Sequence, residues 1–133
     1  MEQIREAAGC IADKLSVLPQ FAVILGSGLG SFADQLESKV EIAFSDIPHF
    51  PVSTVQGHAG KIVVGSISSI PVMVLQGRFH YYEGYSMQEV TFPLRCLLHL
   101  KIPNLIVTNA AGSVDLNYKP GDLMLIKDHI KLQ

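Results

Sequence analysis

Residues 21–30 read FAVILGSGLG, a continuous apolar run that leads directly into a loop of glycines. An apolar run of this kind is typical of a strand that is covered on both faces of a sheet. In the loop, Gly26–Gly30, backbone N–H groups are free and the missing side chains allow an anion to approach closely. Taken alone, the loop is either an anion-binding cradle or a simple tight turn.

Two common nucleotide-binding motifs do not fit this loop. The dinucleotide fingerprint requires a third glycine where Ser31 stands, and Asp46, at the distance expected for its acidic residue, lies in a proline-rich loop. The Walker A motif fails as well, because Gly60-Lys61 is followed by Ile62 where a serine or threonine should hold magnesium. Neither motif is therefore supported.

Helices and strands are predicted to alternate along the rest of the chain. Amphipathic or capped segments predict helices at 2–15, around 32–36 and at 87–100, and apolar runs predict strands at 39–44, 61–67, 71–76, 104–108 and 122–127. Ser68-Ser69 suggests a hairpin between two of these strands, and Ser86 with Glu89 forms a capping box before the last helix. This order favours an α/β fold with a mixed, mostly parallel twisted sheet flanked by helices.

Length and composition favour a single domain, residues 1–133, because 48% of the residues are hydrophobic and can form a core. The formal net charge is -2 and the basic residues are dispersed, which argues against nucleic acid as a partner. No apolar stretch is long enough to span a bilayer, and the charged amino terminus is unlike a secretory signal. Cys10 and Cys96 lack CxxC spacing and are expected to be buried, reduced thiols. We therefore expect a cytoplasmic protein without a membrane partner.

A second polar cluster, Arg78–Glu83, follows the strand predicted at 71–76. An arginine suits a tetrahedral oxyanion, and the histidine and tyrosines beside it can converge on the same ligand. The alternative is surface salt bridging, with the aromatic side chains packed as a lid over the core. His80 and Glu83 could also be metal ligands, but no third ligand is apparent and no metal is proposed.

Two further loops carry candidate residues. His58 lies in a glycine turn, Gly57–Gly60, and taken alone it is a polar loop residue. The loop Asn109–Gly112 follows the strand at 104–108, and its N–H groups could meet a ligand or merely allow a turn. Three of the four signals lie at the ends of predicted strands, where open α/β sheets gather ligand-binding groups.

In order and spacing, these segments resemble the trimeric purine nucleoside phosphorylases across nearly the whole chain. The matching segments are Ile24–Gly30, Gly57–Gly60, Gln76–His80 with Tyr82–Tyr85, Thr91–Pro93 and Thr108–Gly112. The resemblance implies a phosphorylase/hydrolase-like fold and the reversible phosphorolysis of purine ribonucleosides or deoxyribonucleosides such as inosine and guanosine. The products would be the free purine and the pentose 1-phosphate.

The resemblance also implies roles for individual residues. The expected phosphate-binding groups are Ser27, Arg78, His80 and the backbone N–H of Ala110. Tyr82 is expected to face the ribose, His58 to lie on a loop over the phosphate entrance, and Glu83 to support His80. His80, Glu83 and His58 are thus the candidate catalytic residues. No metal or organic cofactor is implied, because inorganic phosphate is the co-substrate, and a homotrimer is the expected assembly.

Members of this family are longer than the chain, which ends at Gln133. The groups that recognise and protonate the purine belong to the family's second half, so we expect an incomplete sheet and an inactive or impaired chain. Two alternatives stay open: an enzyme like methylthioadenosine phosphorylase, which the intact Arg78–His80 and Tyr82–Tyr85 segments disfavour, and a non-catalytic phosphate-binding fragment.

Overall fold

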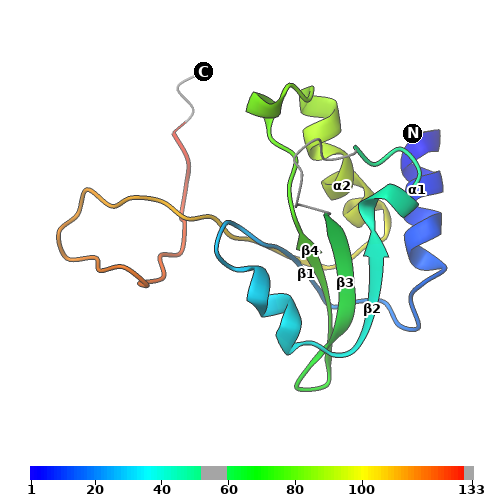
Figure 1. Cartoon of the computed structure of the whole chain (residues 1–133), viewed down its shortest axis with the longest axis horizontal. Helices are drawn as coiled ribbons and strands as arrows, with labels where there is room; N and C mark the ends of the chain where they lie inside the picture. The colour runs from blue at the N-terminus through cyan, green and yellow to red at the C-terminus, as the bar shows by residue number, and fades with distance from the viewer. Residues whose placement is uncertain (52–59, 131–133) are drawn as a thin grey trace.

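The computed structural model describes residues 1–51 and 60–130, in which one five-stranded sheet is flanked by helices (Figure 1). The strands, in the order β2-β3-β4-β1-β5, are β1 at Phe21–Ile24, β2 at Glu37–Ala43, β3 at Lys61–Ile67, β4 at Ile70–Gln76 and β5 at Asn104–Val107. The α-helices are α1 at Glu2–Ala12 and α2 at Met87–His99, and short 3-10 helices are η1 at Gly30–Gln35, η2 at Phe44–Asp46 and η3 at Tyr81–Glu83. The predicted α/β class is confirmed, and the elements predicted before residue 109 are present with their ends shifted by a few residues.

Parallel and antiparallel pairings divide the sheet into two parts. β1 lies between β4 and β5 and is parallel to both, whereas β2, β3 and β4 pair antiparallel as consecutive strands. The turn between β3 and β4 is Ser68-Ser69, and both residues have positive φ, 49° and 66°. Two-residue hairpin turns of this kind require antiparallel strands. The sheet is therefore mixed as predicted, but parallel pairing does not predominate in it.

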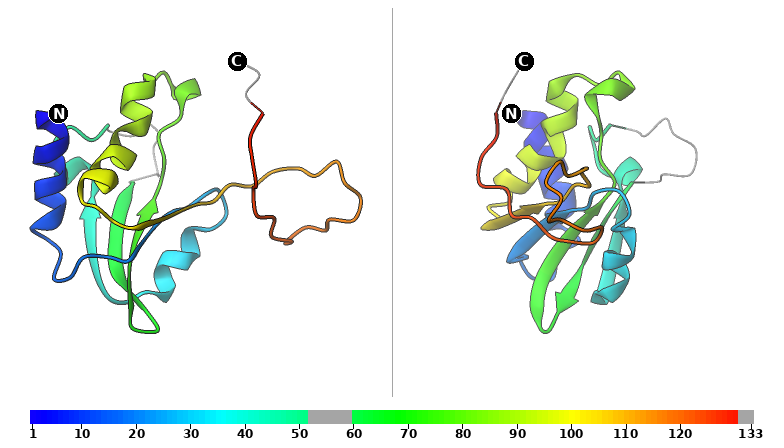
Figure 2. Two further views of the ribbon diagram at one scale, coloured as in Figure 1. Left: turned by 180° about the vertical axis from the view of Figure 1, so that it is seen from behind. Right: turned by 90° about the vertical axis from the view of Figure 1, so that its left-hand side faces the viewer.

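The helices cover one face of the sheet and η1 covers the other (Figure 2). In β4, Met73 and Leu75 pack in the cluster that contains the buried faces of α1 and α2. Their neighbours Val72 and Val74 pack in the second cluster, beside Ala33 of η1. Because successive strand residues point to opposite faces, both faces of this central strand are buried. This explains why the central strands read as continuous apolar runs rather than alternating ones.

β5 forms one edge of the sheet, and its apolar side chains are unusually accessible. Leu105, Ile106 and Val107 are 42%, 46% and 54% exposed, and the segment after β5 extends away from the sheet (Figures 1 and 2). Residues 122–127, all in the described part of the chain, form no strand, so that prediction is wrong. An apolar run becomes a strand only where a neighbouring strand completes its backbone hydrogen bonds, and the described residues place none beside it.

The helices also bear on the question of a membrane. Among residues 1–51 and 60–130, no helix is long and apolar enough to cross a bilayer. The longest, α2, has 13 residues and begins at the predicted capping box, where the Ser86 hydroxyl accepts a hydrogen bond from the backbone N of Glu89. A helix of this length covers one side of a small sheet rather than the thickness of a bilayer.

Candidate functional site

The carboxyl ends of β1, β4 and β5 meet at one edge of the sheet and border an open cleft of about 840 Å³. Parallel strands point the same way, so the loops that follow them are brought together. Six residues singled out by the sequence line this cleft: Ser27, Arg78, His80, Tyr82, Glu83 and Ala110. The seventh candidate, His58, lies outside the described residues. The structure therefore gathers the described candidates from three separate loops.

The glycine loop turns away from β1 at Gly26. The backbone N–H of Gly26 donates to the hydroxyl of Thr108 at 2.8 Å, and a Leu29 N to Gly26 O bond of 3.3 Å closes the turn. A Cβ at Gly26 would lie 2.8 Å from both Arg78 Nη2 and the Thr108 carbonyl oxygen, so only glycine fits there. Ser27 and Gly28 are exposed, and their backbone N–H groups have no partner in the described part of the chain. These N–H groups are free to bind an anion.

Phe79 anchors the segment that carries the charged residues of the cleft. It is 5% exposed, and its ring lies 5.4 Å from the ring of Phe44 and 5.4 Å from the ring of Tyr85. Arg78 and His80, its neighbours on either side, line the cleft. A buried aromatic residue between two polar ones thus fixes the segment to the core while its neighbours face solvent.

The Arg78 guanidinium bridges the ends of β1 and β5. Its Nε donates to the Leu25 carbonyl oxygen at 3.2 Å, and its Nη2 donates to the carbonyl oxygen of Thr108. Its other N–H groups have no partner among residues 1–51 and 60–130, and no carboxylate there forms an ion pair with it. Surface salt bridging is therefore not the role of this arginine in the described part of the chain. A held guanidinium with free donors suits a tetrahedral anion.

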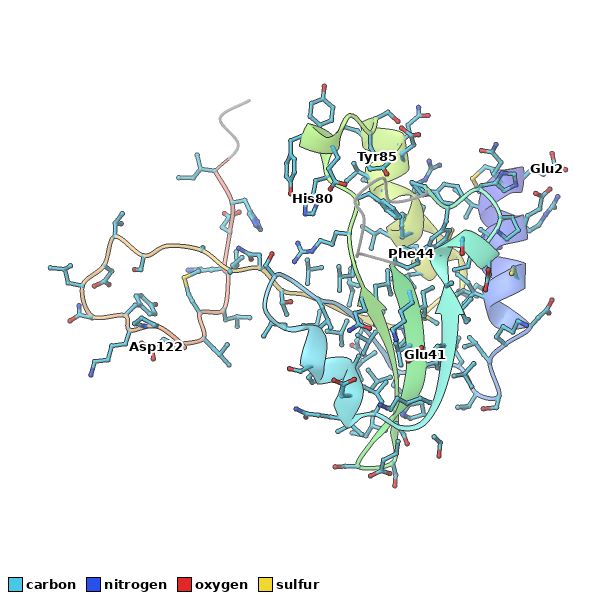
Figure 3. All side chains as sticks on the ribbon, in the orientation of Figure 1. Glu2, Glu41, Phe44, His80, Tyr85 and Asp122 are labelled. Carbon is cyan, nitrogen blue, oxygen red and sulfur yellow. The ribbon has the colours of Figure 1, made fainter. Side chains whose placement is uncertain are left out.

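His80 and Glu83 form a close pair across η3. The ring Nδ1 of His80 lies 2.5 Å from Glu83 Oε1, which also accepts from the His80 backbone N at 3.2 Å. A carboxylate facing Nδ1 places the proton of the ring there and leaves Nε2 without a partner among the described residues. Tyr82 stacks on a face of the imidazole, with ring centroids 4.8 Å apart. Figure 3 shows His80 on the segment between β4 and α2. The pair thus presents one defined face of His80 to the cleft.

Two polar residues that the sequence did not single out hold the glycine loop at its two ends. Thr108 accepts from Gly26 at the start of the loop, and the Gln76 Nε2 donates to the Gly30 carbonyl oxygen at 3.0 Å at its end. Gln76 Oε1 is buried and has no hydrogen-bond partner among the described residues. A polar residue at the end of an apolar run was the available signal for both, but such residues occur at many strand ends that bind nothing.

Metal binding finds no support in the geometry of the described residues. Within residues 1–51 and 60–130, no three side chains of His, Cys, Asp or Glu gather closely enough to hold an ion. His80 and Glu83, the pair considered from the sequence, are bonded to each other. Their mutual contact occupies His80 Nδ1 and Glu83 Oε1.

Two titratable groups on α2 have shifted pKa values, away from the cleft. Hydrogen bonds from the Ser86 side chain and then its backbone hold the pKa of Glu89 below its ordinary value of 4.5. Burial raises the pKa of the Cys96 thiol to about 11. Both shifts belong to the folding of α2, the first to its amino-terminal cap and the second to its buried face.

The fold and the cleft define an α/β protein in which polar groups suited to an anion gather where parallel strands end. The chain belongs to the phosphorylase superfamily, whose family model matches residues 20–133. Within it, the chain is similar to purine nucleoside phosphorylases, and the predicted resemblance is confirmed. It is 55% identical over 127 residues to purine nucleoside phosphorylase 1 of Geobacillus stearothermophilus, which covers 96% of this chain and 46% of the relative.

Solved structures agree with the sequence match. A purine nucleoside phosphorylase of Schistosoma mansoni in complex with acetate superposes with a TM-score of 0.84 at 41% identity, covering 92% of this chain and 45% of that one. A complex of the Schistosoma mansoni enzyme with inosine has a TM-score of 0.82 at 39% identity, covering 92% and 42%. The chain thus spans about half the length of the relatives that it matches.

Proposed function

We propose that this chain supplies the phosphate-binding side of a purine nucleoside phosphorylase. The observation that carries the proposal is the Arg78 guanidinium, held by two backbone carbonyl oxygens in a cleft where no described carboxylate pairs with it. Such a cation is suited to an anionic ligand. The family match and the relatives named purine nucleoside phosphorylases make inorganic phosphate the ligand of choice.

The proposed phosphate ligands come from three loops. They are the Ser27 hydroxyl, the Arg78 guanidinium, His80 Nε2 and the backbone N–H of Ala110. Arg78 supplies charge, whereas Ser27 and Ala110 supply directional donors. His80 adds the ring nitrogen Nε2, which can accept a hydrogen bond from the hydroxyl of a phosphate dianion, and Glu83 keeps that ring in place. His58 is proposed to close over the phosphate, on the family resemblance alone.

The proposed reaction is the phosphorolysis of a purine ribonucleoside or deoxyribonucleoside, with inosine and guanosine as the preferred substrates. A phosphate oxygen forms a bond to the anomeric carbon of the sugar while the bond from that carbon to the purine nitrogen breaks. The electron pair of the broken bond leaves with the purine. Positive charge develops on the sugar in between, and a phosphate dianion held beside it stabilises that charge. Tyr82, exposed beside the cleft, is proposed to face the sugar.

Several features of the whole protein belong to the same proposal. Phosphate acts as the co-substrate, and no metal or organic cofactor takes part. The assembly is a homotrimer, which the resemblance supports and sedimentation of the whole protein would test. A cytoplasmic location suits an enzyme that acts on small soluble nucleosides, and the two free cysteines agree with a reducing compartment.

Thermal unfolding with and without phosphate tests the binding site. Phosphate and sulfate should raise the Tm of the chain above that in chloride at equal ionic strength, because they bind the folded state alone. Arg78→Ala and Ser27→Ala should remove most of this increase, since one charge-assisted contact contributes roughly 1.5 to 3 kcal/mol. Arg95→Ala, which removes an exposed arginine from α2, is the matched control and should respond like the wild type. Equal stabilisation of all four proteins would refute the phosphate site.

Activity assays test the reaction itself. The whole protein should convert inosine or guanosine and phosphate to free purine and pentose 1-phosphate, with lower activity on methylthioadenosine. A preference for methylthioadenosine would instead indicate the related phosphorylase. Phosphate binding without cleavage of any of the three nucleosides would leave a phosphate-binding protein and remove the enzyme assignment.

A further inference from the structure

Thr108 stands where three parts of the cleft meet. It directly follows β5, and its backbone N donates to the Ile24 carbonyl oxygen at 3.0 Å. Its hydroxyl donates to the same oxygen at 3.1 Å and accepts from the backbone N of Gly26 at 2.8 Å. Its own carbonyl oxygen accepts from Arg78 Nη2. One residue is thereby bonded to the end of β1, to the first residue of the glycine loop and to the guanidinium.

The hydroxyl of Thr108 has a single proton and therefore one defined hydrogen-bond geometry. With that proton directed to Ile24, the hydroxyl oxygen can only accept from Gly26. This bond sets the direction in which the glycine loop leaves β1. Because a Cβ at Gly26 would lie 2.8 Å from the Thr108 carbonyl oxygen, the two backbones are too close for any residue with a side chain at position 26.

A purely structural strand end does not need this hydroxyl. β5 reads Asn-Leu-Ile-Val, and a further valine would have the same branched shape and the same strand preference as threonine. Valine would leave the Thr108 N–H and carbonyl bonds in place. Only the Gly26 N–H would lose its partner, and only the loop that begins there would be released.

We propose that Thr108 is a positioning residue that sets the glycine loop and the Arg78 guanidinium at the separation that a phosphate needs. The inference rests on the proposed function for the identity of the ligand, phosphate. The contacts of Thr108 with Gly26, Ile24 and Arg78 are observed whatever the ligand is. Ala110 lies two residues further along the same backbone, so the third phosphate-binding element starts from the same fixed point. Thr108 touches no phosphate in this scheme and acts through Gly26 and Arg78.

Two substitutions separate the hydroxyl from the shape of the side chain. Thr108→Val should weaken phosphate binding roughly tenfold, because the glycine loop loses the hydrogen bond from Gly26 to the Thr108 hydroxyl and is no longer held in one direction. Thr108→Ser keeps the hydroxyl and should restore the affinity to within about twofold. Thr91→Val removes a threonine hydroxyl that bonds only within the helix, to Met87 O at 2.7 Å, and is the matched control. Phosphate affinity of the complete 133-residue chain is measured by calorimetry.

Amide hydrogen exchange without phosphate provides a second readout. In Thr108→Val, the Gly26 amide should exchange at least about tenfold faster than in the wild type, while amides in α2 stay unchanged. Unchanged phosphate affinity in Thr108→Val, or the same loss in Thr108→Ser, would overturn the proposal. If the wild type binds no phosphate, the proposed function fails instead, and the exchange rate of the Gly26 amide alone tests the role of Thr108. Faster exchange in Thr108→Val than in the wild type supports that role, and an unchanged rate overturns it.

Discussion

The Nδ1 atom of His80 lies 2.5 Å from the Oε1 atom of Glu83, and the same carboxylate oxygen accepts from the His80 backbone N. Glu83 is thus bonded to both the ring and the backbone of His80, the N-cap residue of η3. The His80 side chain is 41% exposed and that of Glu83 only 16%. The carboxylate is therefore the inner member of the pair, and it holds the more accessible imidazole at the rim of the cleft.

Glu83→Gln should weaken phosphate binding by roughly threefold to tenfold, with a small change in Tm. The amide keeps the shape of the carboxylate but removes its charge, so the hydrogen bond from Nδ1 becomes weaker and the ring is held less firmly with its proton on Nδ1. Nitrogen NMR of the ring would report the change of tautomer. Glu2→Gln, on the exposed side of α1, is the control and should alter neither the phosphate affinity nor the tautomer of His80. A variant that keeps both the affinity and the tautomer would show that Glu83 has no part in orienting the ring.

Gln76→Leu should release the far end of the glycine loop at little cost in stability. The substitution removes the bond to Gly30, but it also removes the buried Oε1 that has no partner among the described residues. These effects oppose each other, so the free energy of unfolding should fall by no more than about 1 kcal/mol while phosphate affinity drops severalfold. Urea unfolding and calorimetry measure the two quantities. A loss of stability well beyond this value, with phosphate binding intact, would mean that Gln76 serves the core instead.

Ser86→Ala should lower the free energy of unfolding by about 1 kcal/mol at neutral pH, because α2 loses its amino-terminal cap. The Ser86 bonds depress the pKa of Glu89, so their contribution is present above its ordinary value of 4.5 and is lost as the pH falls through the folded-state pKa. The difference between the two proteins should therefore be smaller at pH 3 than at pH 7. Urea unfolding at both pH values checks this, with Ser45→Ala as a control outside α2. An equal difference at both pH values would contradict the coupling to Glu89.

Iodoacetamide should label Cys10 at least about tenfold faster than Cys96 in the folded protein, since only the thiolate reacts. Cys10 is partly exposed, whereas Cys96 is buried and its pKa is raised to about 11. The raised pKa favours the neutral thiol in the folded state. Its contribution to the free energy of unfolding is therefore fully present below pH 9.0, the ordinary pKa of the thiol, and is lost as the pH rises through about 11. Mass spectrometry of labelled peptides gives the rates, and Cys10→Ser isolates Cys96. Equal labelling before unfolding would contradict the burial of Cys96.

The arrangement of the cleft could be anticipated where it depends on chain direction alone. The glycine loop and the loop at 109–112 each follow an apolar run, and the parallel strands β1 and β5 place both at one edge. The pairing of His80 with Glu83 also had a signal, because the spacing of three residues is that of the Ser86 and Glu89 capping box. That signal was obscured because histidine is an uncommon first residue of such a box.

Other features depend on contacts between distant residues and leave no local pattern. The roles of Gln76 and Thr108 arise only when β4 and β5 are both placed beside β1. Residues 122–127 have the composition of a strand, but backbone pairing decides the outcome, and no described strand lies beside them. Local composition predicts a preference for extended backbone, whereas a strand exists only as part of a pair.

The position of β1 between two later strands has a consequence for the order of events during protein synthesis. Phe21 of β1 pairs with Val72 of β4 and with Asn104 of β5, so β1 is flanked on both sides only after β5 has been synthesised. The β2-β3-β4 meander pairs strands that are consecutive in the sequence and can form earlier. Until Thr108 has emerged, Gly26 lacks its partner. The loop proposed to bind phosphate therefore takes its shape only after β5 and Thr108 have been synthesised, later than the β2-β3-β4 meander.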